Sequence, residues 1–376
     1  MTLPRGRRYQ GMVRTAAALL CLLSALPAAR AESETPPLAA RAAEAMDAAI
    51  AYFRGKQEAN GSWNNDPGIS SLVLLALSRG GVPADDPSLA RGIDWLLREM
   101  RGRAGRGKLD TYTTSLVVML LADVSAGEHR ETIVRYAKAL AASQCSNGQW
   151  SYLVRPGRPK SGGDNSNAQF AMIAIWSARR AGFDPGDAVW RRAYDYLRDH
   201  QNDDGGWGYS DRQRQSSCGS MTAAGVAATT IARAGLMGAR WRTYDYTADP
   251  VVRRGLGWLG EKFAVDRNPD VEKGVGRGMR DRNSGLIGED FWRFYYLWSV
   301  ERAAGLLERD RIGVHRWYEE GAERLIAEQR DGGRWVGDAS PDRGTAFALL
   351  FLSRGTRPVA TEPALSNETA TPRGEK

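Results

Sequence analysis

The chain has 376 residues, of which 42% are hydrophobic and 26% charged, a balance typical of a globular protein with a substantial core. Disorder along the whole chain is therefore excluded. Five arginines and no acidic residue lie within residues 1–31, so the 52 Lys and Arg minus these five leave 47 against 44 Asp and Glu. This near balance gives no support for nucleic acid as a partner.

The N-terminal segment has the parts of a secretory signal peptide. Residues 1–14 carry four arginines, residues 15–26 are apolar, and Ala29 and Ala31 provide small residues for cleavage near Ala31. The apolar run is too short to cross the ~30 Å hydrocarbon layer, which favours removal over a membrane anchor. We expect residues 1–31 to be a signal peptide and the protein to be exported, periplasmic or secreted, with no transmembrane helix after processing. Arg7-Arg8 leaves both general and twin-arginine export open.

A pattern Q-x-x-x-G-x-W occurs four times with fixed internal spacing, which identifies an internal repeat. Its Gln and Trp residues are Gln57 and Trp63, Gln144 and Trp150, Gln201 and Trp207, and Gln329 and Trp335. The amphipathic segment that precedes the pattern occurs twice more, ending at Met100 and at Phe263. The chain therefore contains six related units.

Each unit pairs an amphipathic segment of helical periodicity with a following segment that is apolar nearly all round. The apolar segments are residues 71–77, 115–122, 170–176, 223–232, 291–298 and 346–352. An apolar helix with no polar face needs neighbours on every side, so these segments predict an inner ring and the amphipathic ones an outer ring. We expect an all-α fold, an (α/α)6 toroid of six helix hairpins with six inner and six outer helices, over residues 38–355. Residues 356–376 lack periodicity and are predicted to be a disordered tail.

The repeated Gln and Trp residues are predicted to be structural. Gly at the fixed position suits a left-handed turn after the outer helix. The Gln and the Trp would then fasten that helix end to the next repeat, with the indole ring covering apolar surface.

The block from Arg192 to Trp207, RAYDYLRDHQNDDGGW, resembles the QW repeat of the terpenoid cyclase and protein prenyltransferase superfamily. Residues 163–170, 219–225 and 295–302 are similar to its secreted bacterial branch, the prenyltransferase and squalene oxidase repeat proteins, which have no agreed reaction. The resemblance covers residues 38–355. It implies an α/α toroid with an aromatic lumen suited to isoprenoid ligands.

The chain departs from the catalytic patterns of that superfamily. The cyclases protonate an alkene with an aspartate of a D-x-D-D motif, and this sequence has none. The prenyltransferases hold zinc with D-x-C and a distant His, but D-x-C is absent and His129, His200 and His315 fall at ends of predicted outer helices. The resemblance therefore implies no metal, no cofactor and no particular reaction.

A candidate site lies where the inner helices are expected to begin, because their N-termini gather at one mouth and favour anionic groups there. The candidate ligand-binding residues are Asn165, Asn167, Gln169, Trp292, Arg293, Tyr295 and Arg343. Phe170 and Trp176 are expected to add aromatic walls. Arg293 either holds an anionic head group or neutralises a buried acid such as Asp290 or Asp342.

Asp164 and Asp290 are weak catalytic candidates, because each also suits a helix cap. They leave open a carbohydrate-active (α/α)6 enzyme with paired carboxylates. The interpretation that we favour is a toroid that binds a small apolar or isoprenoid-like ligand with an anionic or polar head. A non-catalytic scaffold for protein interaction is the third alternative, although no protein partner is indicated.

Cys145 and Cys218 are the cysteines that follow the signal peptide. In an oxidising compartment they either form a disulfide or remain free thiols.

Overall fold

The computed structural model describes residues 36–157, 161–210, 216–271 and 292–354. The predicted signal peptide, the predicted tail 356–376 and Asp290 lie outside these residues. Every helix described below belongs to the compact unit that begins at Leu38.

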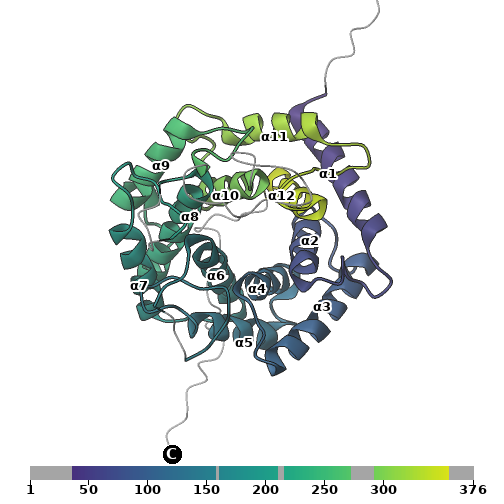
Figure 1. Ribbon diagram of the computed structural model, residues 1–376, viewed down its shortest axis with the longest axis horizontal. Helices are drawn as coiled ribbons and strands as arrows, with labels where there is room; N and C mark the ends of the chain where they lie inside the picture. Colours follow the sequence, from purple (N-terminus) through teal and green to yellow (C-terminus); the bar gives the residue numbers. More distant parts are fainter. Residues whose placement is uncertain (1–35, 158–160, 211–215, 272–291, 355–376) are drawn as a thin grey trace, which may run out of the picture. The chain divides into compact units, whose positions relative to one another are not determined.

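Twelve α-helices of the described residues form two concentric rings (Figure 1). The outer helices are α1 (Leu38–Lys56), α3 (Pro87–Gly105), α5 (Arg130–Ala141), α7 (Asp187–Asp199), α9 (Pro250–Lys262) and α11 (Trp317–Glu328). The inner helices are α2 (Pro67–Arg79), α4 (Thr111–Ser125), α6 (Asn165–Ser177), α8 (Gly219–Leu236), α10 (Arg293–Leu306) and α12 (Pro341–Leu352). The 3-10 helices are η1 (Ala178–Ala181), η2 (Gly238–Arg240) and η3 (Tyr246–Ala248).

The inner ring is closed by helix packing. Each inner helix contacts the next one in chain order, and α12 contacts α2. Outside the helices, the described residues form isolated β-bridges only. The prediction of an all-α (α/α)6 toroid is confirmed.

Burial separates the two rings as the apolar pattern predicts. All side chains of α6 are buried, including those of Asn165, Asn167 and Gln169. The outer helix α7 buries one face only, with residues such as Val189, Ala193 and Leu197. An inner helix is enclosed by two inner neighbours and an outer layer, so its polar side chains must find partners inside the protein.

The four repeated Trp residues make the same hydrogen bond in every copy. Each indole Nε1 donates to the main-chain oxygen ten residues earlier, at 2.8–2.9 Å, and each ring is 0–1% exposed. The acceptors are Phe53, Leu140, Leu197 and Leu325. The indole therefore pins the end of its own outer helix to the turn that follows.

The four repeated Gln residues link consecutive outer helices. Each Gln Nε2 donates to the oxygen of the Gly four residues later and to a main-chain oxygen within the next outer helix. The cross-helix acceptors are Ser88, Val189, Val251 and Ala45 for Gln57, Gln144, Gln201 and Gln329 respectively. Gln329 thus joins the last outer helix to the first.

Glycine is required in these turns by both conformation and space. Gly148 has φ +97°, and a Cβ atom there would lie 2.2 Å from the main-chain oxygen of Arg192. The unit of α9 lacks the Gln and the Trp, and its close backbone approach joins Gly260 of α9 to Gly313, which precedes α11. A Cβ on Gly260 would lie 2.9 Å from the Cα of Gly313. This unit therefore also has a close backbone contact, although it lacks the repeated Gln and Trp.

One inner helix begins later than its apolar pattern indicates. The pattern predicts a start at residue 291, but α10 begins at Arg293, because Trp292 has a left-handed backbone with φ +60°. Phe291 lies outside the described residues.

Cys145 and Cys218 are both buried, and the structure shows no disulfide between them. None of the helices in the described ranges combines the length and hydropathy that a membrane span requires.

Candidate functional site

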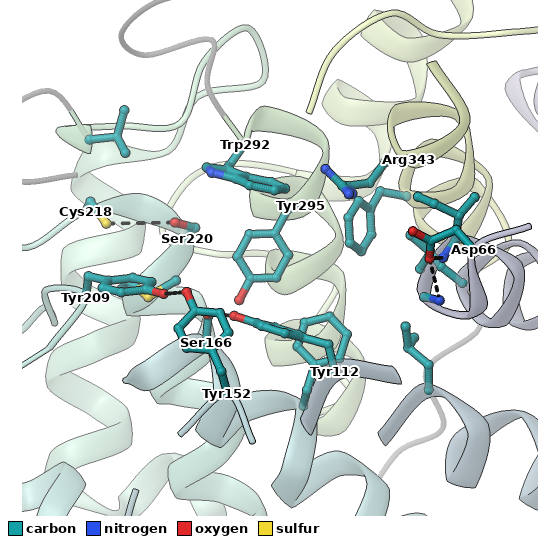
Figure 2. Close-up of a pocket in the computed structure, with 18 residues that line it drawn as sticks. Asp66, Tyr112, Tyr152, Ser166, Tyr209, Cys218, Ser220, Trp292, Tyr295 and Arg343 are labelled. Carbon is teal, nitrogen blue, oxygen red and sulfur yellow. Dashed lines mark hydrogen bonds between the residues drawn. The ribbon is translucent and has the colours of Figure 1, made fainter. Parts of the chain in front are cut away.

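The N-terminal ends of the inner helices surround a cavity of about 430 Å³ (Figure 2). Its apolar and aromatic lining consists of Ile69, Leu72, Tyr112, Leu116, Tyr152, Phe170, Tyr209, Met221, Val271, Trp292, Tyr295 and Phe347. The other lining residues are Asp66, Gly68, Ser166, Cys218, Ser220 and Arg343. A mostly apolar cavity of this size with a few polar groups is typical of a small-molecule site.

Packed aromatic rings form one wall of the cavity. Phe170 and Tyr295 stack with ring centres 6.1 Å apart, and Phe347 lies 5.6 Å from Tyr295. Trp298, which is fully buried, contacts both Phe170 and Phe347 at 5.0 and 5.4 Å. Inner helices α6, α10 and α12 thus bring their rings together at the level of the lumen.

The hydroxyl of Tyr295 is tied to α6. It donates to Gln169 Oε1 at 2.7 Å, and burial raises the pKa of Tyr295 well above its ordinary value. Tyr295 is therefore a neutral group. The amide Nε2 of Gln169 is buried and has no hydrogen-bond partner in the described part of the chain.

Arg343 provides the guanidinium group of the cavity wall. It lies 5.4 Å from the centre of the Trp292 ring, and its Nη1 donates to the main-chain oxygen of Asp338 at 3.1 Å. Within the described ranges it makes no ion pair with a carboxylate. The charge and the remaining N–H donors of Arg343 are therefore available to an anionic group in the cavity.

Asp338 holds the first turn of α10, the helix that carries Tyr295. Its carboxylate accepts from the main-chain N–H groups of Tyr295 at 2.6 Å and Phe294 at 3.3 Å, and so caps α10 in place of a residue before the helix. Burial raises the pKa of Asp338 to about 7, against the opposing effects of these hydrogen bonds and of the Arg293 and Arg343 charges. Asp338, Ala339 and Trp292 all have left-handed backbones, with φ of +51°, +70° and +60°. Such strain is common at binding sites.

Hydroxyl groups gather on the opposite side of the cavity from Trp292 and Arg343 (Figure 2). The hydroxyls of Tyr152 and Tyr209 are 2.5 Å apart, and Tyr112 hydrogen-bonds to Ser166. Ser166 Oγ in turn donates to Asp164 Oδ1 at 3.1 Å. Tyr152 and Tyr209 each stand two residues after a repeated Trp, and this W-x-Y pattern in neighbouring repeats was the signal that sequence reasoning missed.

Asp164, Asn165 and Asn167 are engaged with protein atoms and do not line the cavity. Asp164 caps α6 by accepting from the main-chain and side-chain nitrogens of Asn167, both at 2.8 Å, and burial raises its pKa. Asn165 donates to the main-chain oxygen of Gly208 at 2.8 Å and accepts from Gln149 at 3.1 Å. The polar run at the start of α6 therefore joins two neighbouring turns.

Arg293 has a partner other than the two acids named above. We expected it to hold an anionic head or to neutralise a buried acid such as Asp290 or Asp342, and its guanidinium pairs with Glu328 of α11. Arg293 is absent from the cavity lining, whereas Arg343 lines the cavity. Arg293 is the first residue of α10 and follows Trp292, whose backbone is left-handed.

Trp176 is also placed differently from the expected lumen wall. It packs against Trp190 and Trp241 with ring centres 6.3 and 5.4 Å away, and the guanidinium of Arg179 lies 4.5 Å from its ring. It is not among the lining residues of the cavity. Trp176 therefore serves the packing between inner and outer rings.

No protein-family model and no curated protein matches the chain. Among solved structures, a variant of the type II terpene cyclase MstE from Scytonema, in complex with geranylgeranyl dihydroxybenzoate, has a TM-score of 0.51 at 15% identity. That alignment covers 85% of this chain and 98% of the cyclase. A second variant, in complex with the product merosterolic acid A, has a TM-score of 0.52 over the same shares of both chains at 15% identity.

A glycoside hydrolase is similar over the same share of this chain. An inactive variant of the α-1,6-mannanase GH76A from Salegentibacter sp. HEL1_6, with two neighbouring aspartates replaced, was solved with α-1,6-mannotetrose. It has a TM-score of 0.57 at 9% identity, covering 85% of this chain and 99% of the mannanase. These likenesses establish the (α/α)6 toroid, which is a fold shared by proteins of different activity.

Proposed function

We propose that this protein is an exported toroid that binds an apolar, isoprenoid-like ligand in its cavity, with an anionic or polar head of the ligand at Arg343. The observation that carries the proposal is the composition of the cavity wall. Aliphatic and aromatic side chains from all six inner helices and adjoining loops make up most of the wall, and Arg343 contributes its guanidinium group. Burial of an apolar chain against such a wall is favourable by about 25 cal/mol per Å².

Arg343 and Trp292 define where a head group would sit. A guanidinium with N–H donors free of carboxylates is suited to two-pronged contact with a carboxylate or phosphate. The cation–π contact with the Trp292 ring restrains the guanidinium, which lowers the entropy that Arg343 would lose on binding. The apolar body would then lie toward Phe170, Tyr295 and Phe347.

The comparison with the cyclase supports an isoprenoid over other apolar molecules. The same fold, in that protein, holds geranylgeranyl dihydroxybenzoate, which joins a prenyl chain to a polar aromatic head. The absence of D-x-D-D from this sequence means that the proposal extends to binding and assigns no cyclisation chemistry.

The described residues favour binding over glycoside hydrolysis. Hydrolysis of this kind uses two carboxyl groups that flank the scissile bond. Among the described lining residues, Asp66 is the one carboxylate, and it caps α2 by accepting from Gly68 and Ile69. Two pairs of neighbouring aspartates, Asp85-Asp86 and Asp203-Asp204, occur in the described chain. In the first pair Asp86 caps α3, and in the second Asp204 accepts hydrogen bonds from Ser217 and Trp258.

Isothermal titration with farnesyl diphosphate, farnesol and mannotetraose tests the proposal. We expect both prenyl compounds to bind and mannotetraose not to bind. Arg343→Met should weaken farnesyl diphosphate at least about tenfold, the loss expected for a charge-assisted hydrogen bond, and change farnesol much less. Arg253→Met, an exposed position on α9, is the matched control and should change neither affinity.

Failure of both prenyl compounds to bind the wild type would contradict the proposed ligand class. Tight binding of mannotetraose would favour the carbohydrate alternative instead. Export is tested separately by intact mass of the protein recovered from cells, which should begin directly after the predicted cleavage site near Ala31.

A further inference from the structure

A second group of buried polar side chains lies at the other end of the inner ring from the cavity. The cavity is lined from the N-terminal parts of the inner helices, whereas this group comes from their C-terminal parts. It consists of Arg79 at the end of α2, Asp123 on α4, Arg180 on η1, and Glu301 and Arg302 on α10. The side chains of all five are at most 10% exposed.

Arg302 is the central member of this group. It stands one helical turn after Trp298 on α10, with its guanidinium 4.9 Å from the centre of the Trp298 ring. Since Trp298 packs against the aromatic wall of the cavity, Arg302 lies one turn further from the mouth. The side chain of Arg302 is 3% exposed.

The carboxylates of the group give Arg302 an ion pair but no hydrogen bond. Asp123 is shared by Arg79, at 2.7 Å from Nε, and by Arg180. Glu301 Oε2 lies 3.6 Å from Arg302 Nε, which is within ion-pair distance but beyond hydrogen-bond distance. Arg302 Nε and Nη2 are buried and have no hydrogen-bond partner in the described part of the chain.

The guanidinium of Arg302 keeps its charge in this position. Burial, and next the charge of Arg79, lower its pKa to about 9, which still leaves it protonated at neutral pH. Glu301 and Asp123 offset part of the positive charge, but the five residues hold three arginines against two carboxylates, Asp123 and Glu301. One positive charge within this group is therefore unbalanced, and buried donors without hydrogen bonds add to its cost.

We propose that Arg302 holds a small monovalent inorganic anion of the halide class at this end of the inner ring. Its Nε and Nη2 donors point to a ligand that accepts hydrogen bonds, and the nearby guanidinium groups of Arg79 and Arg180 strengthen the preference for negative charge. A small spherical anion suits an enclosed place better than a carboxylate or a phosphate. This site is separate from the proposed ligand cavity and does not depend on its occupant.

Thermal unfolding in sodium chloride, sodium bromide and sodium gluconate at equal ionic strength tests this proposal. The wild type should show a saturable rise in melting temperature of a few degrees with chloride or bromide over gluconate, because an anion that binds only the folded state stabilises it. Arg302→Met keeps the apolar stem and should abolish that difference. Arg293→Met is the matched control, a buried arginine already paired with Glu328, and should retain it.

Equal melting temperatures of the wild type in chloride and gluconate would overturn the proposal, as would an unchanged halide effect in Arg302→Met. Bromide anomalous diffraction from wild-type crystals covers the case in which Arg302→Met does not fold. A bromide peak within hydrogen-bond distance of Arg302 Nη2 is expected. No peak there, or a peak without any halide effect on unfolding, which would mean an adventitious ion only, contradicts the site.

Discussion

The side-chain nitrogen Nε2 of Gln329 donates to the main-chain oxygen of Ala45 at 2.8 Å, although 284 positions separate the two residues. This bond ties α11 to α1 and so closes the outer ring, in the way that Gln57, Gln144 and Gln201 tie the earlier outer helices together.

Replacing Gln329 with Leu should destabilise the fold by about 1–3 kcal/mol, because the main-chain oxygens of Ala45 and Gly333 both lose their donor. Gln329→Glu should cost more, since a carboxylate would then face two carbonyl oxygens. Urea denaturation measures both variants. A free energy of unfolding for Gln329→Leu within error of the wild type would show that the ring needs no such closure.

Trp207→Ala should destabilise the protein by about 3–5 kcal/mol, the usual cost of removing a buried Trp. The indole is 0% exposed, donates to Leu197 and packs against Gly225 and Gly255, so its removal leaves a cavity and an unsatisfied oxygen. The melting temperature is the measurement. An unchanged melting temperature together with lost ligand binding would instead give Trp207 a role in the site.

Arg293→Met and Arg343→Met should separate stability from binding. Arg293 pairs with the partly buried Glu328, so its loss should lower the free energy of unfolding by about 1–3 kcal/mol and leave affinity for farnesyl diphosphate nearly unchanged. Arg343 has no such pair among the described residues, so its loss should weaken binding with little effect on unfolding. Thermal melts and titrations on both variants measure the two effects. The reverse pattern would restore Arg293 as the head-group residue.

The free energy of unfolding should fall as the pH rises from about 4 to about 7, because of Asp338. Its folded pKa of about 7 lies above the ordinary value, so in this range the folded state holds a proton that the unfolded state has released. The stabilisation is full below pH 4 and is lost as pH rises through 7. Denaturation of the wild type and Asp338→Asn over this range should give a stability difference that shifts in favour of the variant with rising pH. A constant difference would mean that Asp338 stays ionised.

The ring architecture could be predicted from the sequence because it rests on repeated local rules. The fixed spacing of Gln, Gly and Trp locates the turns, and the apolar segments identify the inner helices. Both signals depend on residues close together in the chain, such as Trp207 and its acceptor Leu197, ten residues before it.

The site was less predictable because it depends on contacts between distant turns. Asp338 caps α10 from more than forty residues later, which no local capping rule can identify. Arg293 pairs with Glu328 of α11 and does not line the cavity, and helical periodicity alone does not show this. Tyr152 and Tyr209 meet only because two loops face each other across the mouth.

A crystal structure of the mature protein with geranylgeranyl diphosphate would show directly whether the cavity binds a prenyl ligand. We expect density for the prenyl chain within the cavity, against Phe170 and Tyr295, with a phosphate oxygen within hydrogen-bond distance of the Arg343 guanidinium. A ligand bound only on the outer surface, or a cavity that stays empty at saturating ligand while the helices are well ordered, would contradict this expectation.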